Sequence, residues 1–227
     1  MELELVVRAK MVGRVMRRAR RISRAIDRGF EPLRAGWTVD AYDPQALLEA
    51  FPRLRLREGF RLSSYHFFDG VNGNGFVFAI PADEELPEPP EEGFDFGRDP
   101  LPEWASADIG RFLEGDGSVL AYFQASIFIR ELGEMGTLRQ GCTWFPQEVI
   151  TDGRDIAGQA WQWREEEPLE WLPTVWRDGG GPRFVVFYTY TGLGRERILR
   201  HTDVYAAGYR FEQNPREIAL GEGGYLL

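Results

Sequence analysis

The stretch SVLAYFQASIFIRELGE, residues 118–134, predicts the central element of the fold. Ser118 is a preferred residue at a helix N-cap, and Gly136 is typical of a helix end. The apolar residues between them leave only a narrow polar stripe: Val119, Leu120, Tyr122, Phe123, Ala125, Ile127, Phe128, Ile129 and Leu132. A helix with so little polar surface is normally covered on most sides. We therefore expect a central helix from Ser118 to about Glu134.

The segments around this helix are rich in strand formers and turn residues. The β-branched and aromatic run Phe184–Tyr190 is followed by a Gly-Leu-Gly turn, which predicts a hairpin with the next segment. The predicted strands are 53–57, 60–68, 75–80, 184–190, 195–205, 216–220 and 225–227, and shorter helices are predicted at 44–51 and 106–114. No strand–helix–strand alternation with Gly-rich turns occurs. The sequence therefore predicts an α+β fold, in which a mostly antiparallel sheet packs against the 118–134 helix.

The N-terminal segment differs in charge from the rest of the chain. Residues 1–34 contain ten basic and four acidic residues, so they carry +6, whereas the whole chain carries −9 and residues 35–227 therefore carry −15. A helix over residues 3–30 would place apolar residues on one side and arginines on the other. These arginines are the predicted binding residues: Arg14, Arg17, Arg20, Arg21, Arg24 and Arg28. The sequence predicts an amphipathic helical arm over 1–34 joined to one α+β domain over 35–227, with a short first strand at Glu-Leu-Glu-Leu as the alternative.

An acidic, proline-rich segment lies between the two predicted hairpins. Residues 83–103 contain nine acidic residues, one basic residue and five prolines, which predicts an extended surface loop. These acids could neutralise the arginines of the arm, and those of Arg53-Leu54-Arg55-Leu56-Arg57, within one chain or between two copies. In that interpretation the apolar face of the arm packs on its own body.

The composition limits the class of protein. A hydrophobic content of 43% and a charged content of 28% indicate a globular, acidic protein. Cys142 is the only cysteine, so the chain has no intramolecular disulfide and no cysteine-based zinc site. No apolar run approaches about 18 residues, and the N-terminus lacks the apolar stretch of a signal peptide. We therefore expect a cytoplasmic protein without a membrane span.

The two histidines are the first candidates for catalysis. His201-Thr202-Asp203 has the His-x-Asp spacing of iron sites with two histidines and one carboxylate. The second histidine would have to be His66, with Asp69 beside it, if the two hairpins meet. These four residues are the candidate metal ligands of a small metal-dependent enzyme. The alternative is that His201 and Asp203 form a local hydrogen-bonded pair on a sheet face, and we expect no metal or other cofactor.

Three other groups of residues have a structural interpretation beside a chemical one. Cys142 could act as a nucleophile with His66 or His201, but Gly-Cys-Thr-Trp matches no protease signature, and a lone cysteine among aromatic residues is typical of a core. Asp69, Asn72 and Asn74 lack the spacing of an EF-hand loop, which favours a structural turn. Glu131 and Glu134 share one helix face, where we expect a solvated edge or pairing with Arg130 and Arg139.

No glycine-rich phosphate-binding motif is present. The leading functional hypothesis is a non-enzymatic protein-interaction module, in which the arm docks a partner protein or a second copy. The first alternative is the metal-dependent enzyme with a His/Asp cluster. The second is a binder of anionic lipid or nucleic-acid surfaces through the arm. The negative charge of the body disfavours nucleic acid, whereas peripheral membrane contact stays open.

Overall fold

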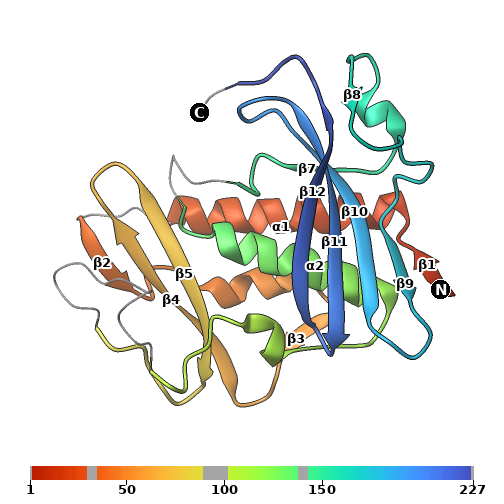
Figure 1. The fold of residues 1–227 in the computed structure, drawn as a ribbon. Helices are drawn as coiled ribbons and strands as arrows, with labels where there is room; N and C mark the ends of the chain where they lie inside the picture. Colours follow the sequence, from red (N-terminus) through yellow and green to blue (C-terminus); the bar gives the residue numbers. More distant parts are fainter. Residues whose placement is uncertain (1, 30–34, 89–101, 138–142, 226–227) are drawn as a thin grey trace.

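The computed structural model describes residues 2–29, 35–88, 102–137 and 143–225 (Figure 1). The strands are β1 (Glu2–Val6), β2 (Gly36–Val39), β3 (Leu54–Leu56), β4 (Phe60–Phe68), β5 (Gly73–Pro81), β6 (Leu113–Gly115), β7 (Glu148–Ile150), β8 (Gln162–Trp163), β9 (Thr174–Arg177), β10 (Arg183–Thr191), β11 (Arg197–Ala207) and β12 (Arg210–Leu220). The helices are α1 (Ala9–Gly29) and α2 (Val119–Glu134), and the 3-10 helices are η1 (Pro44–Ala50), η2 (Ile109–Phe112) and η3 (Gly153–Ile156).

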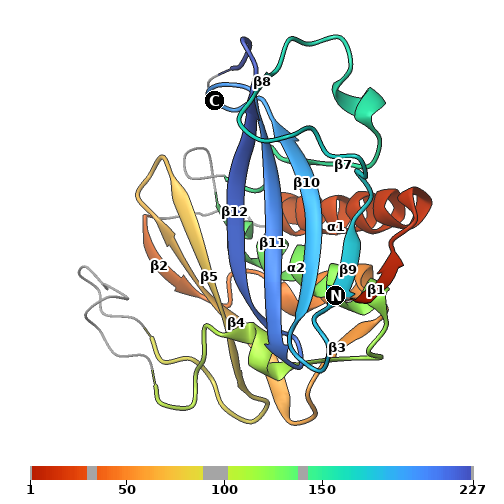
Figure 2. The ribbon, with the colours of Figure 1, turned by 45° about the vertical axis from the view of Figure 1, so that its right-hand side comes forward.

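The fold is α+β with antiparallel sheets, as the sequence predicts. The largest sheet has the strand order β1-β9-β10-β11-β12-β8, and β7 also pairs with β10. A second sheet has the order β2-β4-β5, and β3 pairs with β6. In Figures 1 and 2 the two long helices lie on one face of the large sheet, and the three-stranded sheet stands beside it. No helix in the described part of the chain is long and apolar enough to cross a membrane.

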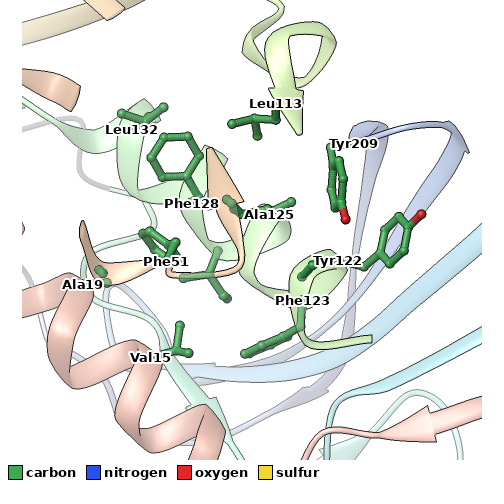
Figure 3. Close-up of a cluster of buried hydrophobic side chains, with 14 of the residues drawn as sticks. Val15, Ala19, Phe51, Leu113, Tyr122, Phe123, Ala125, Phe128, Leu132 and Tyr209 are labelled. Carbon is green, nitrogen blue, oxygen red and sulfur yellow. The ribbon is translucent and has the colours of Figure 1, made fainter. Parts of the chain in front are cut away.

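Helix α2 begins at the predicted cap and is largely buried. The Ser118 hydroxyl accepts a hydrogen bond from the Ala121 amide at 3.2 Å. The Phe123 ring packs against Phe187 of β10 with centroids 5.9 Å apart, and most of the α2 side chains are buried. The one amide side chain of the helix is also satisfied, because Gln124 Oε1 accepts from the backbone N–H of Arg53 at 3.0 Å. Figure 3 shows the cluster of apolar side chains around this helix.

Helix α1 is amphipathic, but it starts later than the sequence predicts. Residues 2–6 pair with β9 as strand β1, so the alternative of a short first strand is the one that forms. Val12, Val15 and Ala19 are buried in the same cluster as Phe51 and the α2 side chains (Figure 3). The apolar face of α1 is therefore part of the core of the body, and its arginine face points away from that core.

Both predicted hairpins form. β4 pairs with β5 along both strands, and the whole of β10 pairs with residues 197–205 of β11, both antiparallel. β12 is longer than the predicted strand at 216–220, because it pairs with β11 along most of that strand. The segment 106–114, predicted as a helix, forms the short η2 followed by β6. The segment 44–51 forms the 3-10 helix η1, capped by Asp43, whose carboxylate accepts from the Gln45 amide at 2.9 Å.

The arginines of β3 and its flank find partners outside the acidic segment. Arg53 pairs with Asp116 at 2.6 Å, and Arg55 pairs with Glu114 of β6 at 2.9 Å. Among the described residues these two arginines pair with carboxylates of β6 and its flank rather than with the acidic segment, because β6 lies directly beside β3. Residues 89–101 of the acidic segment lie outside the described residues.

Candidate functional site

The outward face of α1 is cationic. Its exposed basic side chains are Lys10, Arg14, Arg17, Arg18, Arg21 and Arg24. None of them forms an ion pair within the described part of the chain. The side chain of Arg28 lies outside the described residues. Helix α1 therefore presents a row of basic groups without a direct ion pair to a described carboxylate, although the exposed Glu148 lies nearby.

Arg20 is different from its neighbours, because it is engaged inside the protein. Its Nε lies 3.1 Å from Glu131 Oε1, and its terminal nitrogens donate to three backbone oxygens, those of Trp144 (3.1 Å), Phe145 (2.7 Å) and Gln147 (3.1 Å). Burial lowers the pKa of this guanidinium, whereas the nearby carboxylates of Glu131 and Glu134 act in the opposite direction. Arg20 therefore fastens the loop 143–147 to α1.

The same loop is fastened to α2 by two carboxylates. Glu131, whose side chain is only 3% exposed, accepts from Trp144 Nε1 at 2.9 Å and from the Ser23 hydroxyl at 3.0 Å. Glu134 accepts from the Thr143 amide at 2.7 Å, the Thr143 hydroxyl at 2.9 Å and the Phe145 amide at 3.2 Å. The expected solvated edge at Glu131 is wrong, since α1 and the loop cover it. Its cationic partner is Arg20 rather than Arg130.

A groove of about 780 Å³ lies between α1 and residues 145–151, and we call it the α1 groove. Four of the six arginines predicted to bind a partner line it, namely Arg17, Arg20, Arg21 and Arg24. The other lining residues are Val12, Gly13, Met16, Ala25, Phe145, Gln147, Glu148, Val149 and Thr151. Arg14 is exposed but does not line the groove. The groove thus combines four arginines with apolar side chains and one carboxylate, that of Glu148.

Phe145 is the aromatic anchor of this groove. Its side chain is 42% exposed, which is high for a residue of this size. The guanidinium groups of Arg20 and Arg24 lie over its ring, 5.0 Å and 5.5 Å from the centroid. Cation–π contacts of this kind hold arginines in place at a surface. The backbone of Phe145 is bonded through both of its polar groups, because its oxygen accepts from Arg20 and its amide donates to Glu134.

His201 belongs to a buried hydrogen-bonded chain behind the groove. The Thr189 hydroxyl donates to Gln147 Oε1 at 2.6 Å, so it must accept from His201 Nε2 at 2.8 Å. The other ring nitrogen, Nδ1, then faces an Arg130 nitrogen at 3.4 Å. Burial and the charge of Arg130 lower the pKa of His201 to about 3. His201 is therefore a neutral structural residue that helps to place Gln147 on the groove wall.

The Asp203 carboxylate forms a buried ion pair. Both of its oxygens accept from Arg130, each at 2.7 Å, and its side chain is fully buried. His201 and Asp203 lie on the same face of β11, as their spacing suggests, but Arg130 of α2 lies between them as the common partner. This bidentate geometry satisfies the carboxylate and joins α2 to the large sheet.

His66 lies in the other sheet and has separate partners. Its Nε2 is 2.9 Å from the backbone oxygen of Gly136, and its ring lies edge-on to Tyr42 with centroids 6.4 Å apart. Burial lowers the pKa of His66, although the hydrogen bond to Gly136 acts in the opposite direction. The two histidines are thus held by different elements, β4 with Gly136 and β11 with α2 and β10.

Asp69 is held in a turn of its own. Asp69 Oδ1 accepts from the amides of Val71 and Asn72 at 2.7 Å and 2.6 Å, which is the geometry of a structural turn and lowers the pKa of this carboxyl. No group of three or more His, Cys, Asp or Glu residues able to hold a metal ion occurs among the residues that the structure describes. Cys142 lies outside the described residues.

Several residues of the groove and of the hydrogen-bonded chain behind it carry no signal that the sequence could have revealed. Phe145 and Gln147 lie in a segment without periodicity, and Thr189 is one of several strand threonines. Their roles depend on contacts with residues more than forty positions away in the chain, such as the Arg20 bond to Phe145 and the Thr189 bond to Gln147.

Comparison with protein families, with curated proteins and with solved structures gives no match for this chain.

Proposed function

We propose that this chain is a non-enzymatic protein-interaction module, which binds an acidic segment of a partner protein in the α1 groove. The observation that carries the proposal is the charge of that groove. Arg17, Arg21 and Arg24 line it with exposed side chains, and in the described part of the chain none of the three has an ion-pair partner. Guanidinium groups suit carboxylates because their planar donors match both oxygens.

The apolar part of the groove favours a peptide over a simple anion. Met16 and Phe145 lie beside the arginines, and exposed aromatic and arginine side chains are the residue types that dominate binding energies at interfaces. Exposed ion pairs contribute about 0–1 kcal/mol each, so three of them cannot give tight binding alone. An acidic segment with apolar residues would use both kinds of group.

The charge of the whole molecule favours a short anionic segment over a polyanion. The chain carries −9, so a long nucleic acid or an acidic membrane would meet repulsion beyond the groove. A segment of a few residues would contact only the local cationic surface. This difference supports a protein partner over an anionic surface, which stays the rival function.

Peptide binding to two charge-reversal variants tests the proposal. The probe is a fluorescein-labelled synthetic peptide that alternates glutamate and leucine, with glutamine in place of glutamate as the neutral comparison. The double variant Arg17→Glu with Arg21→Glu should weaken binding by about tenfold or more. The matched control is Arg14→Glu with Arg18→Glu, which makes the same charge change on the same helix outside the groove. Equal losses in the two variants would contradict the proposal.

Three further measurements separate the possible occupants. Sedimentation without peptide tests a second copy, because self-association lost in the groove variant alone would make another copy the occupant. Acidic vesicles and duplex DNA serve as rival anions under the same conditions. Binding of either one more tightly than the peptide would favour the anionic-surface function. Binding of the peptide should also weaken as salt rises, since exposed charges are screened.

A further inference from the structure

We infer that the acidic segment binds as an added β-strand along the outer edge of β7, next to the α1 groove. This inference rests on the proposed function and adds the conformation and the backbone contacts of the ligand. Adding a strand to an open sheet edge is a general way of binding extended peptides, in which backbone hydrogen bonds supply affinity and side-chain sites supply specificity.

The topology of the large sheet leaves this edge open. On one side of β10, two strands follow one another: β9 pairs with residues 183–186 and β7 pairs with residues 188–190. Outside β9 lies β1, which pairs with it from Glu2 to Val6. No strand of the described chain pairs with the outer edge of β7. The outermost row of the sheet is therefore occupied beside β9 and open beside β7.

The course of the N-terminal segment explains why the outermost row of the sheet ends beside β9 and does not continue beside β7. The Val7 amide still donates to the backbone oxygen of Pro173 at 2.8 Å, which continues the pairing of β1 with the chain before β9. Helix α1 then begins at Ala9, and its buried residues Val12 and Val15 hold it on the core. The segment that carries β7 passes alongside this helix in both views (Figures 1 and 2). An added strand would lie between the two.

The backbone groups that flank β7 already have hydrogen-bond partners. Only the backbone groups within β7 are therefore available to an added strand. The Gln147 oxygen accepts from Arg20, and the Thr151 amide donates to Asp155 Oδ2 at 3.0 Å. Between them, alternate N–H and C=O groups of a strand point to opposite sides, so pairing with β10 uses only one of the two sets. The edge is short, which predicts a small number of backbone hydrogen bonds and a dependence on side-chain contacts.

The spacing of the arginines matches an extended acidic ligand. Arg17 and Arg21 are four residues apart on α1, which corresponds to a rise of about 6 Å along the helix. Alternate side chains of a strand repeat about every 6.6 Å on one face. Carboxylates at alternate positions of the added strand would therefore face these two arginines in turn. Charged side chains next to an open edge also discourage unspecific pairing with other strands.

Backbone methylation of the same probe peptide tests this inference. Methyl groups are placed on the amide nitrogens of all leucines in one peptide and of all glutamates in a second peptide. In an added strand only one of these two sets of amides points toward β7. We expect one methylated peptide to bind about tenfold or more weakly than the parent peptide, because it loses its one or two backbone hydrogen bonds to the carbonyls of β7 and its methyl groups collide with the edge. The other methylated peptide, which is the matched control, should bind within about twofold of the parent, since its methylated amides point away from β7.

Hydrogen exchange gives a second readout on the protein itself. Binding of the parent peptide should slow amide exchange in residues 147–151, with no comparable change in β12 on the far side of the sheet. If the parent peptide binds in a manner that depends on Arg17 and Arg21, but both methylated peptides bind alike and exchange in 147–151 is unchanged, the added strand is refuted while the proposed function stands. If the parent peptide does not bind at all, both proposals fail.

Discussion

The buried ion pair of Arg130 with Asp203 offers a sharp test of the structure. Asp203→Asn removes the negative charge, keeps the side-chain volume and leaves the guanidinium inside the protein. The Arg130 side chain is 5% exposed and that of Asp203 is 0% exposed, and the rings of Trp144 and Phe187 surround the cation at 5.6 Å and 5.1 Å. Only a small part of the guanidinium is therefore within reach of water once the carboxylate is lost.

The expected loss follows from this burial. Removing one partner of a buried pair typically costs about 3–5 kcal/mol, because the remaining charge stays uncompensated. For a chain of this length, each kcal/mol shifts the melting temperature by about 2–4 °C, so we expect a fall of roughly 6–20 °C. The matched control is Glu114→Gln, which makes the same chemical change at the exposed pair with Arg55 and should cost about 1 kcal/mol or less.

Urea unfolding followed by tryptophan fluorescence measures both variants, since the chain has seven tryptophans. The double variant Arg130→Met with Asp203→Leu removes both charges and should recover much of the lost free energy of unfolding. An Asp203→Asn variant as stable as Glu114→Gln would refute the argument, because it would mean that Arg130 is solvated. A double variant less stable than the single one would contradict it as well.

Two further predictions concern His201, behind the groove, and Arg20, which lines it. His201, with a pKa near 3 in the folded protein, binds its proton more weakly there than in the unfolded chain, where the pKa is about 6.5. Its contribution to stability is therefore complete above about pH 6.5 and is lost as the pH falls from there toward 3. Between about pH 6.5 and 5 the free energy of unfolding of the His201→Gln variant should fall by about 2 kcal/mol less than that of the unchanged protein. An unchanged pH dependence would contradict this assignment. Arg20→Met should destabilise the protein by about 3–5 kcal/mol in urea, because Glu131 stays buried without its cation, whereas Arg18→Met on the exposed face should change stability by less than about 0.5 kcal/mol; equal effects would show that Arg20 does not hold the loop.

The features that the sequence predicted correctly depend on neighbours in the chain. Ser118 caps α2 through an amide three residues away. The β10–β11 hairpin follows from a strand-forming run, a glycine turn and a second strand in direct succession. The same holds for the β4–β5 hairpin. In each case the pattern that identifies the element lies within the element or its turn.

The features that it missed depend on distant partners. β7 and β9 are short, and their sequences show no clear alternation of apolar and polar residues. They form because β10 offers each of them an unpaired part of its edge. Residues 2–6 fit a helix or a strand by pattern alone, and their pairing with β9 selects the strand. Pairing energy between segments far apart in the chain is invisible to local periodicity.

The amino-acid sequence by itself determined the α+β class, the two long helices, the two hairpins and the segregation of arginines on one side of α1, because side-chain periodicity fixes which face an element buries. Only the tertiary structure decided what each charged group does. Arg17, Arg20 and Arg21 are chemically identical and close in sequence, yet Arg20 alone is bonded to Glu131 and to loop oxygens more than a hundred residues away. The other two remain exposed in the groove, since the charge of a side chain is local but its compensation depends on what the fold brings beside it.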